Sequence, residues 1–127
     1  GHFTFKACPI SSTTEVPSQE CFDSHPLTFI SDEFYGAVPD PSFPERVYVA
    51  PETIATKVKS SEEGFQDGML FRFNLQLPEG LVGDLVLIQW YYVASNTGCI
   101  HEGYDDYEWP ANWIESSVAG DDGPSIW

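Results

Sequence analysis

The segment GYDDYEWPANW, at residues 103–113, concentrates aromatic and acidic side chains and is the first candidate for binding chemistry. Its rings are Tyr104, Tyr107, Trp109 and Trp113, and its acids are Asp105, Asp106 and Glu108. Flat rings stack on the C–H faces of sugars, while carboxylates accept hydrogen bonds from sugar hydroxyls. The segment therefore predicts a polysaccharide-contacting surface. In the alternative interpretation, Trp109 and Trp113 pin the loop to the core and the acids face water.

The same carboxylates do not form a recognisable catalytic pair. Glycoside hydrolysis needs two carboxyl groups at a defined separation across the scissile bond. Acidic residues that are neighbours on one loop do not ensure that separation. Calcium has little support, because no D-x-D-x-D-G pattern is present. The sequence also lacks a G-x-S-x-G nucleophile motif and a glycine-rich phosphate loop. We therefore predict no catalytic residue in this chain.

Three histidines, His2, His25 and His101, are the remaining candidates for metal binding. They are far apart in sequence, and neither a CxxC nor an HxxxH spacing occurs. A Gly-His start could bind copper through its amine, amide and imidazole nitrogens, but this is weak peptide chemistry rather than a preorganised site. We expect no metal ligand among the three.

The charge of the chain narrows the choice of partners. Twenty acidic residues against five Lys and Arg give the 127 residues a net charge of −15, which repels phosphate backbones and anionic lipid. No apolar run approaches the roughly 18 residues of a membrane helix, and we expect any export signal to have been removed already. Hydrophobic residues at 42% and aromatic residues at 15% predict one folded domain rather than an acidic tail. Nucleic acid and membrane are not expected partners.

The three cysteines fit an extracellular disulfide framework better than a zinc site. Cys8 and Cys21 are the expected pair, and their bridge would stabilise the fold by roughly 3 kcal/mol. Cys99 is then left over, which indicates a free thiol, an intermolecular bond, or a partner outside the sequence.

Two segments alternate in the manner of half-buried strands. Residues 2–8 place Phe3, Phe5 and Ala7 on one face and the polar His2, Thr4 and Lys6 on the other. Residues 69–77 place Met69, Phe71, Phe73, Leu75 and Leu77 inward.

Residues 85–93, LVLIQWYYV, are mainly apolar at both even- and odd-numbered positions, which predicts a central strand covered on both faces. This segment is the best candidate for the core. Shorter strands are expected at 26–30 and 46–50, separated by a proline-rich irregular excursion, and residues 95–127 show no convincing helix. These elements predict an all-β sandwich with long irregular loops.

The segment DLVLIQWYYVASNTGC, at residues 84–99, resembles the penultimate strand of the lytic polysaccharide monooxygenases and chitin-binding type-4 domains through a VLxQWxYxxxN core. At the start of the chain, GHFTFKACP…CFD resembles the stretch that follows their second copper histidine, written H-x-G-[aromatic]-F-x-[aromatic]-x-x-C. LFRFNLQLPEGL matches the strand that precedes the Q-W element. The order and spacing of these motifs agree over most of the chain.

The resemblance implies an immunoglobulin-like or fibronectin III-like β-sandwich that presents a flat face to chitin, cellulose or a related polymer. In active members, a brace of two histidines holds one copper ion. By this alignment both histidines lie upstream of Gly1, and His2 occupies an aromatic position of the motif and is not a ligand. The chain stops where members carry a further strand with an axial aromatic and a cysteine, so the partner of Cys99 would lie in that tail. Residues 1–127 are therefore expected to be one domain, or a segment of a larger one.

Gln89 and Tyr91 match the family strand, where such residues support the core or the copper surroundings. In the alternative interpretation, Gln89 and Tyr91 simply pack in the core, and the side-chain amide of Gln89 is hydrogen-bonded there.

These observations give two hypotheses. The first is a secreted polysaccharide-binding domain that resembles a lytic polysaccharide monooxygenase, has no cofactor of its own, and belongs to a copper enzyme only if the parent protein supplies the brace. This chain alone is not expected to be active. The second is a non-catalytic structural or adhesive module that assembles with itself or with wall polymers.

Overall fold

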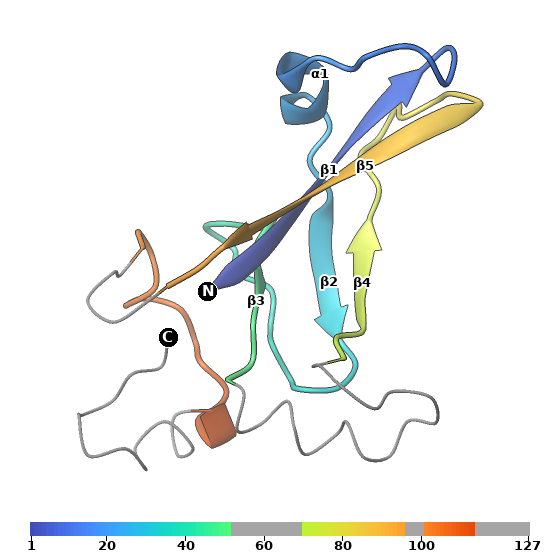
Figure 1. Ribbon diagram of the computed structural model, residues 1–127. Helices are drawn as coiled ribbons and strands as arrows, with labels where there is room; N and C mark the ends of the chain where they lie inside the picture. Colours follow the sequence, from blue (N-terminus) through green and yellow to red (C-terminus); the bar gives the residue numbers. More distant parts are fainter. Residues whose placement is uncertain (52–69, 96–100, 114–127) are drawn as a thin grey trace.

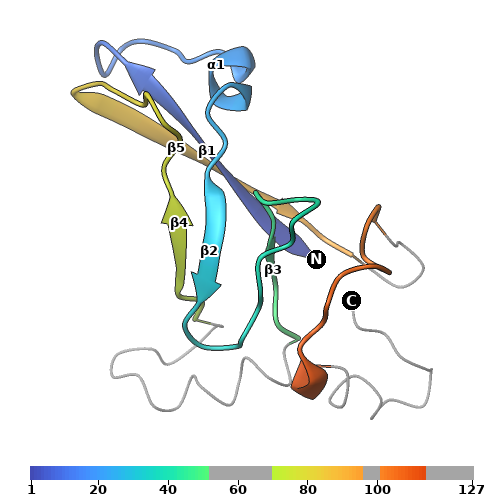
Figure 2. The ribbon, with the colours of Figure 1, turned by 180° about the vertical axis from the view of Figure 1, so that it is seen from behind.

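The computed structural model describes residues 1–51, 70–95 and 101–113 and consists mainly of strands (Figure 1; Figure 2 shows the opposite side). The elements in chain order are β1 (His2–Ile10), α1 (Gln19–Asp23), β2 (Thr28–Asp32), β3 (Val47–Tyr48), β4 (Phe73–Gln76) and β5 (Leu85–Val93). The all-β prediction is confirmed. None of the described helical segments has the length and apolar content that crossing a membrane would need.

The strands form two antiparallel sheets. β1 lies between β3 and β5 in one sheet, and β2 pairs with β4 in the other, with an irregularity between Phe29 and Ser31. β1 and β5 pair along their full lengths, from His2 opposite Val93 to Ile10 opposite Leu85. They form a long twisted ribbon that crosses the β2–β4 pair (Figure 1).

The face of β1 that carries Phe3, Phe5 and Ala7 packs against the β2–β4 sheet. Phe3 and Phe5 lie 6.2 and 5.4 Å from Phe73 of β4, measured between ring centroids, and Ala7 is fully buried. The alternation of residues 2–8 therefore predicts this contact face. In the β4 region, Phe71, Phe73 and Leu75 pack against the core as expected, whereas Leu77 is 53% exposed and Met69 lies outside the described residues.

The prediction that residues 85–93 form a central strand covered on both faces is wrong for the described structure. Among the described strands, β5 is at the end of its sheet and pairs with β1 alone. Its large apolar side chains are exposed, including Trp90 at 59% and Tyr91 at 62%. An apolar strand gains stability from being covered, but burial requires neighbouring layers along its whole length, and most side chains of β5 remain exposed.

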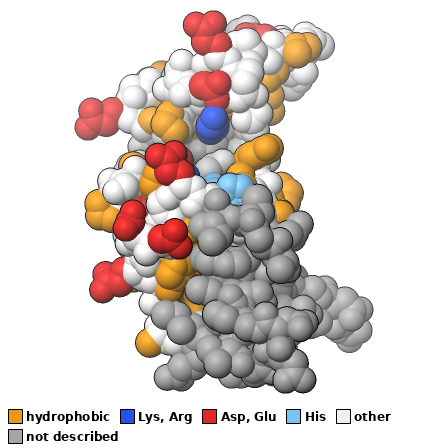
Figure 3. Space-filling model, turned by 90° about the vertical axis from the view of Figure 1, so that its left-hand side faces the viewer, with side chains coloured by type: hydrophobic (Ala, Val, Ile, Leu, Met, Phe, Trp, Pro, Cys, Tyr) orange, Lys and Arg blue, Asp and Glu red, His pale blue; other side chains and the backbone are white. Residues whose placement is uncertain are grey.

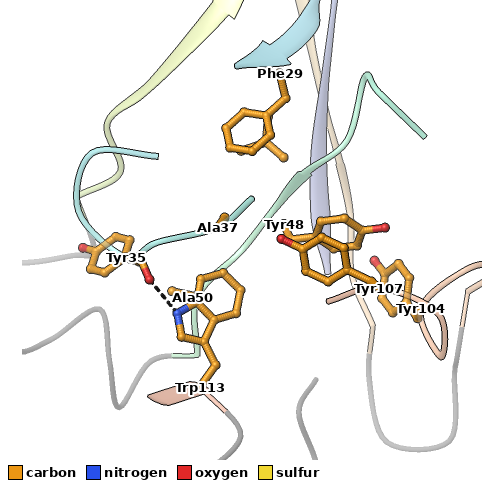
Figure 4. Close-up of a cluster of buried hydrophobic side chains, with 9 residues drawn as sticks. Phe29, Tyr35, Ala37, Tyr48, Ala50, Tyr104, Tyr107 and Trp113 are labelled. Carbon is orange, nitrogen blue, oxygen red and sulfur yellow. Dashed lines mark hydrogen bonds between the residues drawn. The ribbon is translucent and has the colours of Figure 1, made fainter. Parts of the chain in front are cut away.

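The main core gathers where β2, β3 and the 101–113 segment meet (Figure 4). Its largest fully buried side chains are Trp113, Tyr48, Tyr104 and Phe29. Tyr48 stacks on Tyr107 with ring centroids 3.7 Å apart. Large aromatic rings bury about 150–250 Å² each, so a few of them fill the space between two small sheets.

A short helix, α1, covers the opposite face of β1, which carries Lys6 and Cys8. Ser18 caps α1 by accepting a hydrogen bond from the Cys21 backbone N–H at 3.2 Å. The predicted Cys8–Cys21 disulfide is confirmed, with the two Cα atoms 5.5 Å apart, and an ion pair between Lys6 and Asp23 joins the same two elements. α1 is therefore fixed to β1 by one covalent and one ionic link.

Removing this covalent link should destabilise the domain. The bridge spans 13 residues of sequence, for which loop closure predicts a contribution of about 3 kcal/mol. We expect the double variant Cys8→Ala, Cys21→Ala to lose about that much free energy of unfolding in urea titration. Reducing the wild-type chain should give the same loss, and an unchanged midpoint in both samples would contradict the prediction.

Candidate functional site

The aromatic segment 101–113 is part of the core rather than an open binding surface. Tyr104 and Trp113 are fully buried, and Tyr107 is 7% exposed. The Trp113 indole N–H donates to the Tyr35 carbonyl at 2.9 Å (Figure 4), and the Tyr107 hydroxyl donates to the Val38 carbonyl at 2.9 Å. These polar tips are satisfied inside the protein, as buried Tyr and Trp require.

The predicted sugar-contacting rings are therefore poorly placed for that role. Of the four, only Trp109 is partly exposed, and its indole N–H donates to the Tyr104 carbonyl at 2.9 Å. Tyr104, Tyr107 and Trp113 would have to leave the core to stack on a sugar. The alternative interpretation, in which the tryptophans pin the loop, describes the position of Trp113. The acids Asp105, Asp106 and Glu108 are exposed.

A close backbone approach holds the start of this segment. Gly103 has a φ of +82°, and a Cβ at this position would lie 2.3 Å from the Phe43 ring. Arg46 stacks on the same Phe43 ring, with its guanidinium carbon 3.5 Å from the centroid, and donates to the Glu102 carbonyl at 2.6 Å. Glycine is therefore required here both for its conformation and for its lack of a side chain.

His2 lies inside this aromatic cluster, although the alternation of residues 2–8 places it on a polar face. It is 5% exposed, and its Nδ1 forms a 2.5 Å hydrogen bond with the Tyr104 hydroxyl. The rings of Tyr48 and His101 meet it edge-on, with centroids 6.1 and 5.9 Å away. The strand pattern could not show this burial, because the covering rings of Tyr48, His101 and Tyr104 all lie far from His2 in sequence.

Burial lowers the pKa of His2 from 6.5 to about 3, and the charges of Arg46 and of a protonated His101 act in the same direction. His2 is therefore neutral in the folded protein at neutral pH. The hydrogen bond with Tyr104 then joins two uncharged groups.

The three histidines have polar partners within the protein. In the part of the chain that the structure describes, no group of three or more His, Cys, Asp or Glu side chains is placed to hold a metal ion. His2 uses Nδ1 for Tyr104, and His101 uses Nε2 for the Ala94 carbonyl at 3.0 Å. We derive no copper chemistry from these residues.

A second candidate site lies on the other side of the β1–β5 ribbon, beneath α1. It is a pocket of about 290 Å³, which we call the α1 pocket, lined by Thr4, Lys6, Gln19, Gln89 and Tyr91. Gln19 and Gln89 form a reciprocal pair in which each amide N–H donates to the other amide oxygen, at 3.1 and 3.0 Å. The Tyr91 ring is 62% exposed at its rim.

Cross-strand register explains why these side chains meet. Thr4 is opposite Tyr91 and Lys6 is opposite Gln89, so all four side chains project from one face of the ribbon. Cys8 is on the same face, and its disulfide brings α1, and with it Gln19, over them. Gln89 and Tyr91 were expected to support a core, but they line an accessible surface, since most side chains of β5 remain exposed.

The α1 pocket was missed at the sequence level, although a signal for it exists. Thr4, Lys6 and Cys8 alternate on one strand face, and Gln19 precedes Cys21 by two residues. The predicted Cys8–Cys21 bridge is enough to place Gln19 above that face. The partner strand was the missing information, since nothing local specifies that residue 6 pairs with residue 89.

The charged side chains on one side of the molecule are mainly acidic. Figure 3 shows Asp and Glu side chains spread over one side of the described surface, with a basic side chain among them.

In comparisons with known proteins, the chain matches no family model, no curated protein and no solved structure.

Acidification should destabilise the domain through His2. The unfolded chain takes up a proton near pH 6.5 and the folded chain only near pH 3, so the stabilising effect is complete above pH 6.5 and is lost as the pH falls toward 3. The slope for one proton is about 1.4 kcal/mol per pH unit. We expect His2→Gln to remove that part of the pH dependence in urea unfolding. Parallel curves for variant and wild type would show that His2 titrates normally.

Replacing Trp113 with alanine should leave a large core cavity and remove the hydrogen bond that the indole N–H donates to the Tyr35 carbonyl. We expect a loss of about 3–5 kcal/mol in the free energy of unfolding, measured by urea titration. Glu108→Ala, in the same segment but exposed, is the matched control and should stay within about 0.5 kcal/mol of wild type. If both variants were as stable as wild type, Trp113 would not be a core residue.

Proposed function

We propose that this chain is an extracellular polysaccharide-binding domain that holds one sugar ring of a polymer in the α1 pocket. The observation that carries the proposal is the exposed Tyr91 ring beside the Gln19–Gln89 amide pair. A sugar ring needs a flat apolar surface for its C–H face and both donors and acceptors for its hydroxyls. The pocket offers these groups within one small volume.

The size and polarity of the pocket support this ligand class. Pockets for small molecules usually measure about 300–1,000 Å³, so a volume of about 290 Å³ suits a single ring rather than a whole oligosaccharide. Thr4 adds a hydroxyl, and the charge of Lys6 is balanced by Asp23. A neutral hydroxyl-rich ligand therefore fits better than an anion, which the net charge of −15 also disfavours.

The resemblance to lytic polysaccharide monooxygenases and chitin-binding type-4 domains agrees with this proposal. It adds an immunoglobulin-like or fibronectin III-like β-sandwich as the finer fold, which two antiparallel sheets in aromatic contact support. The disulfide supports a secreted protein, because such bonds persist in oxidising compartments. Copper enters only if the parent protein supplies the histidine brace, and residues 1–127 would then contribute binding rather than oxidation.

Tyr91→Ala should reduce retention on the polymer that the wild-type chain binds. The measurement is a pull-down on chitin, cellulose and pectin, with the bound fraction compared across protein concentrations. Losing one stacked ring costs about 1 kcal/mol or more, so we expect binding to weaken at least severalfold.

Tyr92→Ala is the matched control. Tyr92 is the next residue and is 46% exposed, but its side chain projects from the opposite face of β5, where it contacts Phe3. It should keep wild-type retention. Equal losses in the two variants, or a loss in Tyr92→Ala alone, would count against the α1 pocket.

A specific observation favours a second function, that of a self-assembling structural or adhesive module. This observation is the open apolar edge of β5, which is distinct from the α1 pocket.

A further inference from the structure

β5 presents an open strand edge in the described part of the chain. It pairs with β1 on one side, and no described strand lies on its other side. An edge of nine residues leaves a row of backbone N–H and C=O groups ready to pair with another strand. Proteins usually protect such an edge with a charge, a proline or a bulge.

The pairing of β1 shows which residues form this edge. Phe5 accepts a hydrogen bond from Leu27 N–H, and the Ala7 N–H donates to the His25 carbonyl, so odd-numbered residues of β1 turn their backbone groups away from β5. Even-numbered residues of β1 therefore bond to β5, where their partners carry odd numbers. The open edge is then formed by the alternate residues of β5, namely Val86, Ile88, Trp90 and Tyr92.

The sequence of β5 itself contains none of the residues that usually protect such an edge. Residues 85–93 contain no charge, no proline and no glycine, although the whole chain carries −15. The exposed apolar side chains are Leu85, Val86, Leu87, Ile88, Trp90, Tyr91 and Tyr92, with exposed fractions from 38% to 62%. Residues 85–93 offer no charge with which a charged partner could pair. They do offer apolar side chains with which an uncharged apolar strand could pair.

The sequence of β5 is complementary to itself when reversed. Its first half is aliphatic, its second half is mainly aromatic, and Gln89 lies at the centre. Antiparallel pairing of two copies about Gln89 sets Ile88 opposite Trp90 and Val86 opposite Tyr92, and it keeps the two Asp84 carboxylates at opposite ends. Pairs of aromatic and β-branched residues stabilise neighbouring strands, whereas parallel pairing would bring the Asp84 charges together.

We propose that β5 pairs with β5 of a second copy of this chain, antiparallel and centred on Gln89, to form a symmetric dimer with a continuous six-stranded sheet. The two-fold axis passes between the Gln89 residues, so each half of the interface repeats the other. Ile88 and Trp90 make hydrogen-bonded backbone pairs on either side of the axis. This inference does not depend on sugar binding.

Sedimentation velocity on the 127-residue chain, over a concentration series without polymer, tests the proposal. We expect a reversible species of twice the 14.2 kDa chain mass. A wild-type chain that stays monomeric throughout the series would overturn the proposal and assign the edge to some other segment. Larger species that do not dissociate on dilution would overturn it as well.

Two charge variants test the register. Ile88→Glu places two like charges diagonally across the axis, and Trp90→Lys does the same with the opposite sign, so each variant alone should be monomeric. Both sites are more than half exposed, at 52% and 59%, so far-ultraviolet circular dichroism should show a folded chain in each case. Val82→Glu is the control, because Val82 is 80% exposed outside β5 and should leave the dimer intact.

Mixing the two variants should restore a dimer. In the mixed pair, the glutamate introduced at position 88 of one copy lies opposite the lysine introduced at position 90 of the other. The remaining Trp90 lies opposite the remaining Ile88, as in the wild type. Recovery of the doubled mass in the mixture alone supports this register. Dimers in the single variants, or no dimer in the mixture, would overturn it.

Discussion

The pairing of β1 with β5 is the interaction on which the rest of the described structure depends. It fixes nine residue pairs between segments that are about eighty residues apart in sequence. Because side chains alternate along a strand, this one ladder defines two surfaces with different uses. Phe3 and Phe5 face the second sheet and the core, while Thr4 and Lys6 face α1 and its pocket.

The loops depend on carboxylates in place of regular pairing. The proline-rich excursion after β2 cannot form a ladder, yet its backbone N–H groups need acceptors. Asp32 accepts from the Phe34 and Tyr35 N–H groups at 2.9 and 3.1 Å, and buried Asp40 accepts from the Tyr48 hydroxyl at 2.6 Å. Part of the acidity of the chain is therefore structural, because these acids hold the aromatic core in position.

Local pattern predicted the local features of this fold well. The alternation of Phe3, Phe5 and Ala7 and the short spacing of Cys8 and Cys21 each depend on residues close in sequence, and the structure contains both features. The burial of His2 and of the 101–113 rings depends on contacts across long stretches of the chain, which no window of sequence records. The same limit explains β5, whose exposure reflects the layers around it rather than its own composition.

The aromatic side chains of the chain divide between two roles that composition alone cannot separate. Tyr104 and Trp113 are buried in the main core, whereas Trp90 and Tyr91 lie exposed on β5, which has one neighbouring strand among the described residues. Along β5, the backbone groups of odd-numbered residues bond to β1, and those of even-numbered residues face the open edge. The Tyr91 ring rises from one face of the ribbon, away from the plane in which a further strand would pair. Sugar binding at the α1 pocket and strand pairing at the edge are therefore compatible, and a dimer would carry two such pockets on the same side of one continuous sheet.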